Sequence, residues 1–339
     1  MSKRKTSLQS LFPYELQDIT PQAGILWNVS LVNAPSFWQK TRGAEAIVAV
    51  VDTGIDKNHP EFADSRILHS QSFVIESTHD IVGHGTHVAG IIAGRMCGVA
   101  PEAKIIILKT FGVGNGFQFH DAFRFLIDWN EKKPEKDRIA VVNCSWGGPY
   151  DAVIHYSIRK LNSQGTSVVC AAGNAGDGDP ETEEIYNWPG FLFEPITIGA
   201  VNQNATAAKY SSSYDGIDLG APGSEIYSAW PGGGYKLLSG TSMAAPHVTG
   251  ALALIYAAWR QREGRWPTID EAEGVLFKHV RKVLIHRNYI GEGLLDLTYA
   301  TRRWPLYRVQ TGAFFNKTGA DKMEETLKAA KLSTYQVKY

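Results

Sequence analysis

The chain has few cysteines, no net charge and no long hydrophobic segment, and each of these absences excludes a class of protein. Only three cysteines occur among 339 residues, an odd number that fits reduced, buried thiols in a cytosolic protein. Lysine plus arginine number 34, as do aspartate plus glutamate, so no overall charge favours nucleic acid or an anionic membrane. No apolar stretch reaches the length of about 18 residues that a transmembrane helix needs. The composition therefore predicts a globular protein that binds neither nucleic acid nor membrane.

The N-terminus also lacks the features of a signal peptide. It begins Met-Ser-Lys-Arg-Lys and continues with Leu, Gln and Glu, without the apolar stretch that directs export. The basic residues 3–5 form too short a run to act as a charged patch. The sequence thus predicts a cytoplasmic protein.

Short apolar runs alternate with helix-like segments through the middle of the chain. Five runs are predicted to be strands: residues 46–51, 104–109, 140–144, 167–171 and 195–201. Helix-like segments lie between them, for example at 120–130 and 152–164. Because strands that alternate with helices form parallel sheets covered on both faces, we expect one large α/β domain with appendages.

The first of these runs, residues 46–51, leads directly to an aspartate. Its continuous β-prone apolar residues suit a strand that is buried on both faces of a parallel sheet. Asp52 would then lie at the carboxyl end of the strand, where open α/β sheets place their functional sites. Alone, an aspartate in this position is often a turn or helix-capping residue.

Two further segments place a histidine and a serine at the start of apolar helices. Residues 83–90 read Gly-His-Gly-Thr-His-Val-Ala-Gly and open a helix that we expect to run to about Gly94. Residues 239–247 read Ser-Gly-Thr-Ser-Met-Ala-Ala-Pro-His and precede the apolar run 248–259. Ser242 therefore sits at a helix N-terminus, where unpaired N–H groups favour developing negative charge.

The order Asp, His, Ser with these flanking residues closely resembles the subtilisin family of serine proteases. The resemblance implies that Ser242 is the nucleophile, that His84 is the general base and that Asp52 orients the imidazole. It also implies that Asn174, in the segment 168–176, donates its amide to the oxyanion beside the backbone N–H of Ser242. The implied fold is α/β and three-layered, with a mostly parallel central sheet and helices on both faces.

The resemblance extends to a peptide-binding cleft. Residues 144–148 resemble the edge segment of the family, which pairs with an extended substrate, and residues 114–117 resemble the opposite wall. Asn187 falls where the family often has a very small residue at the floor of its main specificity pocket, which argues against a preference for large aromatic side chains. The substrate-binding residues implied in this way are Ser145, Trp146, Gly147, Gly116, Phe119 and Asn187.

About 45 residues precede the first predicted strand of the core, too few for both a signal peptide and a folded prodomain. Within them, Leu11, Phe12, Pro13 and Tyr14 resemble the short inhibitory motif of intracellular subtilisins. By this resemblance, residues 1–20 lie across the active site, and the fixed φ and missing N–H of proline help them to resist cleavage. The alternative is an ordinary hydrophobic turn at a chain end.

Many subtilisins bind calcium in a loop between the histidine helix and a Gly-Val-Ala-Pro segment. Here only residues 95–97 separate Gly94 from that segment, and they cannot supply the six to eight oxygen ligands of a tight calcium site. We therefore expect that loop site to be missing, assign no metal ligand, and expect the chemistry to need no cofactor. Five acidic residues of one loop could hold structural Ca²⁺ or be solvated: Asp177, Asp179, Glu181, Glu183 and Glu184.

The last residues, 301–339, are predicted to form a strand, a helix and a strand. They resemble one half of the sporulation-related repeat of cell-wall hydrolases, which binds peptidoglycan. So short a segment is too small for a core of its own. A helical tail without a binding role is the alternative. The predicted organisation is an inhibitory extension (1–20), a peptidase domain (21–300) and this tail.

Taken together, the motifs predict a serine endopeptidase of the intracellular subtilisin type. It would hydrolyse peptide bonds of intracellular proteins through an acyl-enzyme and be made as a self-inhibited precursor. Its expected partners are protein or peptide substrates, peptidoglycan through the tail and, by analogy with intracellular relatives, a second copy of the chain. The alternative is a catalytically inactive protein of the same fold that binds peptide or peptidoglycan.

Overall fold

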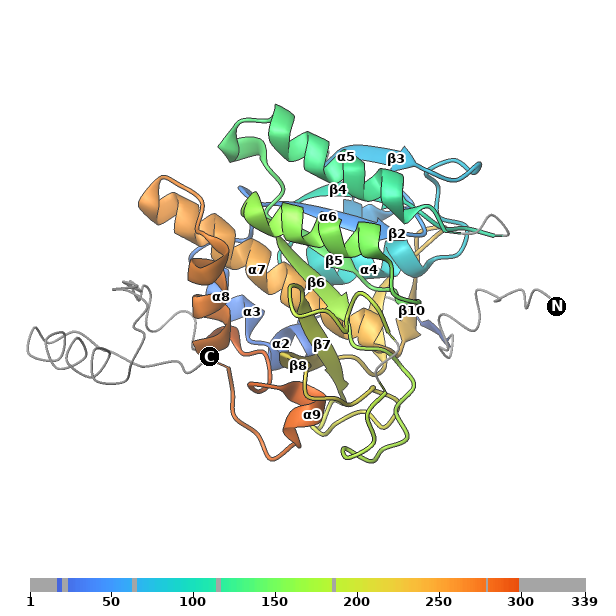
Figure 1. The fold of residues 1–339 in the computed structure, drawn as a ribbon, viewed down its shortest axis with the longest axis vertical. Helices are drawn as coiled ribbons and strands as arrows, with labels where there is room; N and C mark the ends of the chain where they lie inside the picture. The colour runs from blue at the N-terminus through green and yellow to red at the C-terminus, as the bar shows by residue number, and fades with distance from the viewer. Residues whose placement is uncertain are drawn as a thin grey trace, which may run out of the picture. The chain divides into compact units, whose positions relative to one another are not determined.

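The computed structural model places a parallel β-sheet at the centre of the fold (Figure 1). The described residues are 17–19, 24–62, 66–113, 117–184, 187–278 and 280–298. Seven strands pair in the order β3-β4-β2-β5-β6-β7-β8, and every neighbouring pair is parallel. In chain order these strands are β2 (Ile47–Asp52), β3 (Ile67–Ser72), β4 (Lys104–Lys109), β5 (Val141–Cys144), β6 (Ser167–Ala171), β7 (Ile196–Val201) and β8 (Leu219–Pro222).

Burial explains why the inner strands could be recognised from apolar runs. Every residue of β2, β5, β6, β7 and β8 is buried, as expected for strands with both faces covered. The edge strand β3 has the polar sequence Ile-Leu-His-Ser-Gln-Ser and is only partly buried. The five predicted strands are confirmed, whereas β3, with its polar residues, and β8, with glycine and proline, carry no such run.

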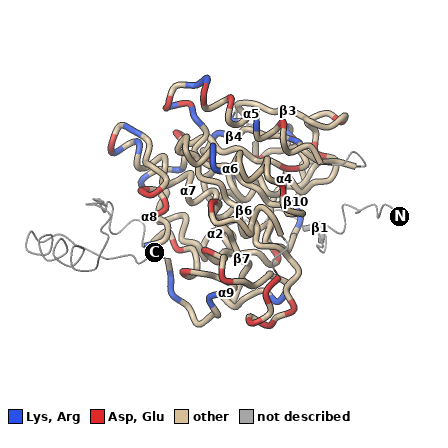
Figure 2. Tube along the Cα trace, viewed as in Figure 1, with Lys and Arg blue, Asp and Glu red and all other residues tan. Residues whose placement is uncertain are grey.

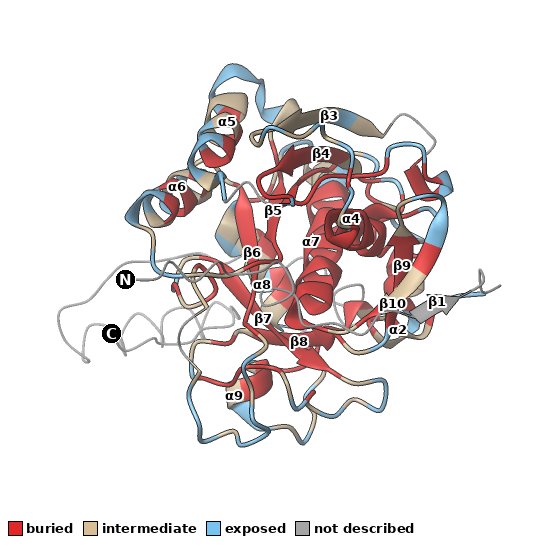
Figure 3. Ribbon diagram, turned by 90° about the vertical axis from the view of Figure 1, so that its right-hand side faces the viewer, coloured by how far each residue is buried: buried red, intermediate tan, exposed pale blue. Residues whose placement is uncertain are grey.

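Helices cover both faces of the sheet (Figures 1 and 3). Alternate residues of β2 point to opposite faces, so Val48 and Val50 pack in one core with α4 and α7, while Ile47 and Ala49 pack in the other with α5 and α6. The bounds are α4 (His84–Ala93), α5 (Phe119–Lys132), α6 (Ala152–Ser163) and α7 (Thr241–Glu263). The three-layer α/β fold with a mostly parallel sheet is therefore confirmed.

A small antiparallel sheet leads the chain into α7. Its strands pair in the order β1-β10-β9, with bounds β1 (Gln17–Ile19), β9 (Ile226–Trp230) and β10 (Gly234–Leu238). Gln17 pairs with Leu237 and Ile19 with Tyr235. Because the pairing is antiparallel, the N-terminal end of β1 lies beside the end of β10 that continues into α7.

Short helices complete the described part of the chain. These are α2 (Trp27–Leu31), α3 (Ala34–Phe37), α8 (Ile269–Lys278) and α9 (Arg287–Ile290), with 3-10 turns at Pro60–Phe62 and Glu135–Asp137. Among the described helices, none is long and apolar enough to cross a membrane. Basic and acidic residues of the described chain are interspersed over helices and loops, in keeping with the zero net charge (Figure 2).

Several predictions concern residues outside the described ranges. They are the inhibitory motif Leu11, Phe12, Pro13 and Tyr14, the cleft residue Gly116, and the strand-helix-strand tail at 301–339. These stay predictions, as do the domain boundaries.

Candidate active site

An aspartate and a histidine meet where β2 ends and α4 begins. Asp52 is the last residue of β2 and His84 the first of α4. His84 Nδ1 lies 2.8 Å from Asp52 Oδ1, and both side chains are fully buried. Because an ionised carboxylate can only accept hydrogen bonds, Nδ1 carries the proton, and the neutral imidazole then has its lone pair on Nε2. The backbone N–H of Thr53 donates to the same Oδ1 at 2.7 Å and helps to hold the carboxylate in place.

A second buried aspartate fixes the start of α4. Asp80 Oδ1 accepts from the backbone N–H groups of Val82 and Gly83 at 3.1 and 2.8 Å. Asp80 Oδ2 accepts from the backbone N–H and the hydroxyl of Thr86 at 2.8 and 2.7 Å. These bonds satisfy N–H groups that the first turn of a helix leaves unpaired. Asp80 is not among the residues predicted from the sequence, although an aspartate shortly before a helix start is a signal for such a cap.

Close backbone contact brings His84 against Asp52. The hydroxyl of Thr53 accepts from the backbone N–H of Gly85 at 2.8 Å. A Cβ on Gly85 would lie only 2.4 Å from the carbonyl oxygen of Gly54, so a side chain here would push the helix away from the strand. Glycine beside His84 is therefore required for the approach of α4 to the end of β2.

Ser242, near the start of α7, is bonded reciprocally to Ser145. Ser242 Oγ donates to the carbonyl oxygen of Ser145 at 3.0 Å, and Ser145 Oγ donates to the carbonyl oxygen of Ser242 at 2.9 Å. The second bond follows from Pro246 inside α7. Proline has no N–H, so the carbonyl four residues earlier, that of Ser242, loses its helical donor and is open to Ser145.

A buried network anchors this pair to the end of β5. Asn143 Nδ2 donates to Ser145 Oγ at 2.9 Å, and Thr249 Oγ1 donates to Asn143 Oδ1 at 2.9 Å. In the register of β2 and β5, Val50 lies opposite Asn143, which sets Asp52 level with Ser145 on the neighbouring strand. The structure therefore brings the Asp52–His84 pair and Ser242 to the same edge of the sheet.

Asn174 lies next to the start of α7 with its amide oxygen engaged. Oδ1 accepts from the backbone N–H and the hydroxyl of Thr241 at 2.8 and 3.0 Å. Since a group that accepts twice must be the oxygen, Nδ2 is the donor that faces the other way. A Cβ on Gly240 would lie 3.5 Å from Asn174 Nδ2 and 3.7 Å from the backbone nitrogen of Ser242, so both nitrogens border the space beside Gly240.

Two other histidines near these helices are structural. His87 Nε2 donates to the carbonyl oxygens of Ile226 and Lys236, and burial lowers the pKa of His87 to about 3. His247 Nδ1 donates to the carbonyl oxygen of Met243, and burial lowers the pKa of His247 to about 4. Such weak bases stay neutral and are poor proton acceptors at neutral pH.

The predicted cleft residues Ser145, Trp146 and Gly147 follow β5 at the same edge of the sheet. Trp146 stacks on Phe119 with ring centroids 3.8 Å apart, and Phe117 stacks on Phe119 with ring centroids 5.7 Å apart. Phe117 is 46% exposed, so this aromatic column has an accessible end. Gly147 lies two residues after Ser145, and Asn187 packs against it.

The segment after α4 is held by hydrogen bonds to Glu61 and Arg66. Glu61 Oε2 accepts from the backbone N–H groups of Met96 and Cys97 at 2.8 and 3.5 Å, and its Oε1 accepts from the Tyr235 hydroxyl at 2.8 Å. The guanidinium of Arg66 donates to the carbonyl oxygens of three residues, Ala93, Pro101 and Glu61. Backbone N–H groups of this short loop thus point toward the Glu61 carboxylate, and the Arg66 guanidinium binds the carbonyl oxygens nearby. A tight calcium site would need such oxygen atoms as its ligands.

The acidic loop residues are engaged separately. Glu184 Oε2 accepts from the backbone N–H of Ser213 at 2.7 Å, while Asp177 and Asp179 each accept from the backbone N–H two residues further on. Among all the described residues, no cluster of three or more His, Cys, Asp or Glu side chains could hold a metal ion.

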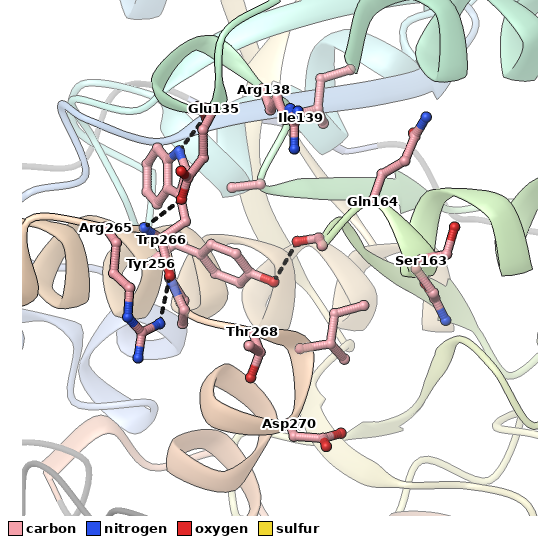
Figure 4. Close-up of a pocket in the computed structure, with 15 residues that line it drawn as sticks. Glu135, Arg138, Ile139, Ser163, Gln164, Tyr256, Arg265, Trp266, Thr268 and Asp270 are labelled. Atoms are coloured by element: carbon pink, nitrogen blue, oxygen red, sulfur yellow. Dashed lines mark hydrogen bonds between the residues drawn. The ribbon is translucent and has the colours of Figure 1, made fainter. Parts of the chain in front are cut away.

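A cavity of about 540 Å³ lies far from these residues in the fold, where β5 and β6 begin (Figure 4). Its lining includes Arg138, Tyr256 and Trp266, and Tyr256 donates to the carbonyl oxygen of Gly165 at 3.1 Å. None of the predicted site residues lines it. The candidate site is therefore the opposite, carboxyl edge of the sheet.

Comparison with known proteins identifies the family of the chain. The family model of the subtilase family matches residues 43–300. An intracellular serine protease of Paenibacillus polymyxa is 37% identical over 301 residues, which cover 85% of this chain and 90% of that protein. The major intracellular serine protease of Bacillus subtilis (strain 168) is 36% identical over 283 residues (80% and 87%), and subtilisin Savinase of Lederbergia lenta is 34% identical over 285 residues (81% and 98%). The chain belongs to the subtilase family and is a serine-type endopeptidase.

Proposed function

We propose that this endopeptidase cleaves cytoplasmic proteins through an acyl-enzyme, with Ser242 as nucleophile, His84 as general base and Asp52 as the residue that orients His84. The observation that carries the proposal is the buried bond of 2.8 Å between His84 Nδ1 and Asp52 Oδ1. This bond lies at the carboxyl edge of the sheet, where two hydrogen bonds with Ser145 hold Ser242. The names of the two intracellular relatives support a cytoplasmic setting.

Each group has a defined task in the reaction. The Ser242 hydroxyl passes its proton to His84 Nε2 while its oxygen attacks the substrate carbonyl carbon. The oxyanion is bound by Asn174 Nδ2 and the backbone N–H of Ser242, whose orientation is fixed before the substrate arrives. His84 then protonates the leaving amine, and a water molecule hydrolyses the ester by the same steps. Asp52, fully buried, stabilises the transient imidazolium.

The described state is a resting one. Ser242 Oγ donates to the carbonyl oxygen of Ser145, Ser242 is 6% exposed and His84 is fully buried. The reaction therefore requires that the Ser242 hydroxyl turns from the Ser145 carbonyl oxygen to His84.

We further propose that residues 1–20 keep the site closed in a precursor. Support comes from β1, whose N-terminal residue Gln17 pairs with Leu237. β10 ends at Leu238, four positions before Ser242. Because Gln17 lies at the end of β10 nearest Ser242, this pairing supports an inhibitory role for the residues that precede it.

A fluorophosphonate probe tests the nucleophile, because it labels only an activated serine. The protein that lacks residues 1–16 should be labelled at Ser242, and Ser242→Ala in the same protein should lose labelling together with peptide hydrolysis, by about 10⁶-fold in kcat. Mass spectrometry of the labelled peptide identifies the residue, and circular dichroism verifies that the variant is folded. Absence of labelling in the truncated protein with Ser242 intact would favour the inactive binding protein instead.

Truncation tests the precursor. Removal of residues 1–16 should raise the initial rate of peptide hydrolysis by about tenfold or more, because a tethered inhibitor acts at an effective concentration on the order of millimolar. Removal of residues 1–10 is the matched control, since it keeps residues 11–14 and should leave the rate low. Equal rates for both truncated proteins and the full chain would exclude the inhibitory role.

A further inference from the structure

The cavity of about 540 Å³ lies at the edge of the sheet where β5 and β6 begin (Figure 4). Three segments line it: the residues before β5, the end of α6 with the turn into β6, and the connection from α7 to α8. Its volume falls within the range of about 300–1,000 Å³ that is usual for small-molecule sites. No residue of the proposed catalytic site lines it, so a ligand here would be recognised by other groups.

The aromatic wall of this cavity is fixed by hydrogen bonds. Trp266 donates its indole N–H to the carbonyl oxygen of Glu135 at 2.6 Å and its backbone N–H to Glu135 Oε1 at 3.2 Å. The hydroxyl of Tyr256 donates to the carbonyl oxygen of Gly165 at 3.1 Å, and the centroids of the Tyr256 and Trp266 rings lie 6.0 Å apart. Because their polar atoms are engaged, the two rings offer an apolar surface that is already in place before a ligand arrives.

The start of α8 forms another side of the cavity and has a complete cap. The backbone N–H of Thr268 donates to Glu271 Oε2 at 2.8 Å, and the backbone N–H of Glu271 donates to Thr268 Oγ1 at 3.2 Å. Glu271 also accepts two hydrogen bonds of 2.7 Å from the guanidinium of Arg265. Since Thr268 and Glu271 cap the helix and Glu271 pairs with Arg265, Asp270 is needed for neither task.

Two lining side chains of opposite charge have no partner within the described residues. The Nε–H of Arg138 is buried and unsatisfied, and no hydrogen bond or ion pair in the described chain engages the guanidinium. The carboxylate of Asp270 also has neither within that part of the chain. Figure 4 shows Arg138 and Asp270 on opposite sides of the cavity. A ligand carboxylate would supply the acceptors that the partly buried guanidinium lacks.

We propose that this cavity binds a short peptide with free termini, a di- or tripeptide with apolar side chains. The peptide carboxylate accepts hydrogen bonds from Arg138, the ammonium group pairs with Asp270, and a side chain packs against Trp266 and Tyr256. A single amino acid carries both charges on one carbon, whereas an extended peptide separates them by about 3.3–3.6 Å per residue and so reaches both sides. The site is independent of the proposed function, because no step of peptide hydrolysis takes place in it.

The test is calorimetric titration of leucyl-phenylalanine into the full-length chain with Ser242→Ala, which does not cleave the peptide. The dipeptide should bind with a Kd below about 1 mM. Adding Arg138→Gln should raise the Kd by about tenfold or more, because a charge-assisted pair is lost. Arg159→Gln is the matched control: it removes an exposed guanidinium of α6 that does not line the cavity, and it should change the Kd by less than about twofold.

Peptides that lack one charge identify the two ends of the site. Acetyl-leucyl-phenylalanine should bind more weakly than the free dipeptide in the Ser242→Ala protein, and equally weakly when Asp270→Asn is added. The dipeptide amide should behave in the same way with Arg138→Gln. Circular dichroism verifies folding, and the Asp270→Asn arm decides the matter if Arg138→Gln does not fold.

Two results would overturn the site. One is a dipeptide that does not bind at about 1 mM, and the other is a Kd that is the same in all variants, which would indicate binding in the active-site cleft instead. Neither result bears on the proposed function, which labelling of Ser242 tests separately.

Discussion

The two ends of α4 are both held by buried carboxylates, yet they differ in what the carboxylate binds. At the N-terminal end, Asp52 binds the imidazole of His84. At the C-terminal end, Glu61 binds backbone N–H groups of the loop that follows the helix, and the hydroxyl of Tyr235. Asp52 thus contacts an imidazole, which can gain a proton, whereas Glu61 contacts N–H and O–H groups that stay protonated.

This difference separates chemistry from stability within a single helix. Loss of the charge at Asp52 changes the tautomer and the basicity of His84, but leaves hydrogen-bond partners for the side chain. Loss of the charge at Glu61 leaves buried N–H donors poorly satisfied, which weakens the folded state. Substitution of each carboxylate by its amide, a change of few atoms, should therefore affect activity at one end and stability at the other.

The largest effect is expected for Asp52→Asn. An amide at this position can donate to His84 and so favours the wrong tautomer, which should lower kcat by about 10⁴-fold while KM changes little. Steady-state kinetics with a peptide anilide measures this, and urea unfolding should give a free energy of unfolding close to that of the wild-type protein. If activity were retained, Asp52 would have no role in orienting His84.

The active-site segments could be predicted because their signals are local in sequence. A buried strand that ends in Asp52, and helices that begin near His84 and Ser242, are each visible within about ten residues. Parallel strands place their carboxyl ends at one edge, and the sequence predicts Asp52 there. The register that sets Asp52 level with Ser145 agrees with that expectation.

Contacts between distant segments could not be predicted in the same way. Arg66 precedes a polar edge strand, and nothing around it indicates that its guanidinium binds the carbonyl oxygens of Ala93 and Pro101. The bond from Ser145 to the Ser242 carbonyl exists because Pro246 removes a donor, but its acceptor can be assigned only when β5 and α7 are placed together. These details depend on tertiary packing, which no single segment encodes.

The strands of the small sheet show the same limit. β9 and β10 are short, and β10 includes glycine and lysine, so neither has the continuous apolar run of an inner strand. They form because β9 packs on α4: a Cβ on Gly90 would lie 2.2 Å from the hydroxyl oxygen of Ser228. The only sign of this contact in the sequence of α4 is thus a glycine, Gly90, within an apolar helix.

The smaller effect is expected for Glu61→Gln. The side chain is 1% exposed, and its amide nitrogen would face an N–H donor or the Tyr235 hydroxyl in place of a carboxylate oxygen. The free energy of unfolding should fall by about 1–3 kcal/mol, the usual cost of leaving a buried polar group unsatisfied. Urea unfolding measures it, and kcat of the folded enzyme should stay within about twofold of the wild-type value, because His84 lies at the other end of the helix.

Thermal unfolding in EDTA and in calcium supplies the control for this end of α4. Glu61 and Arg66 already bind the polar groups of the loop that follows α4. Neither EDTA nor calcium should therefore change the melting temperature of the wild-type protein or of Glu61→Gln. A calcium-dependent rise in the wild-type protein would show that a metal stabilises the fold. A loss of kcat in Glu61→Gln equal to that of Asp52→Asn would show that the two ends of α4 do not act separately.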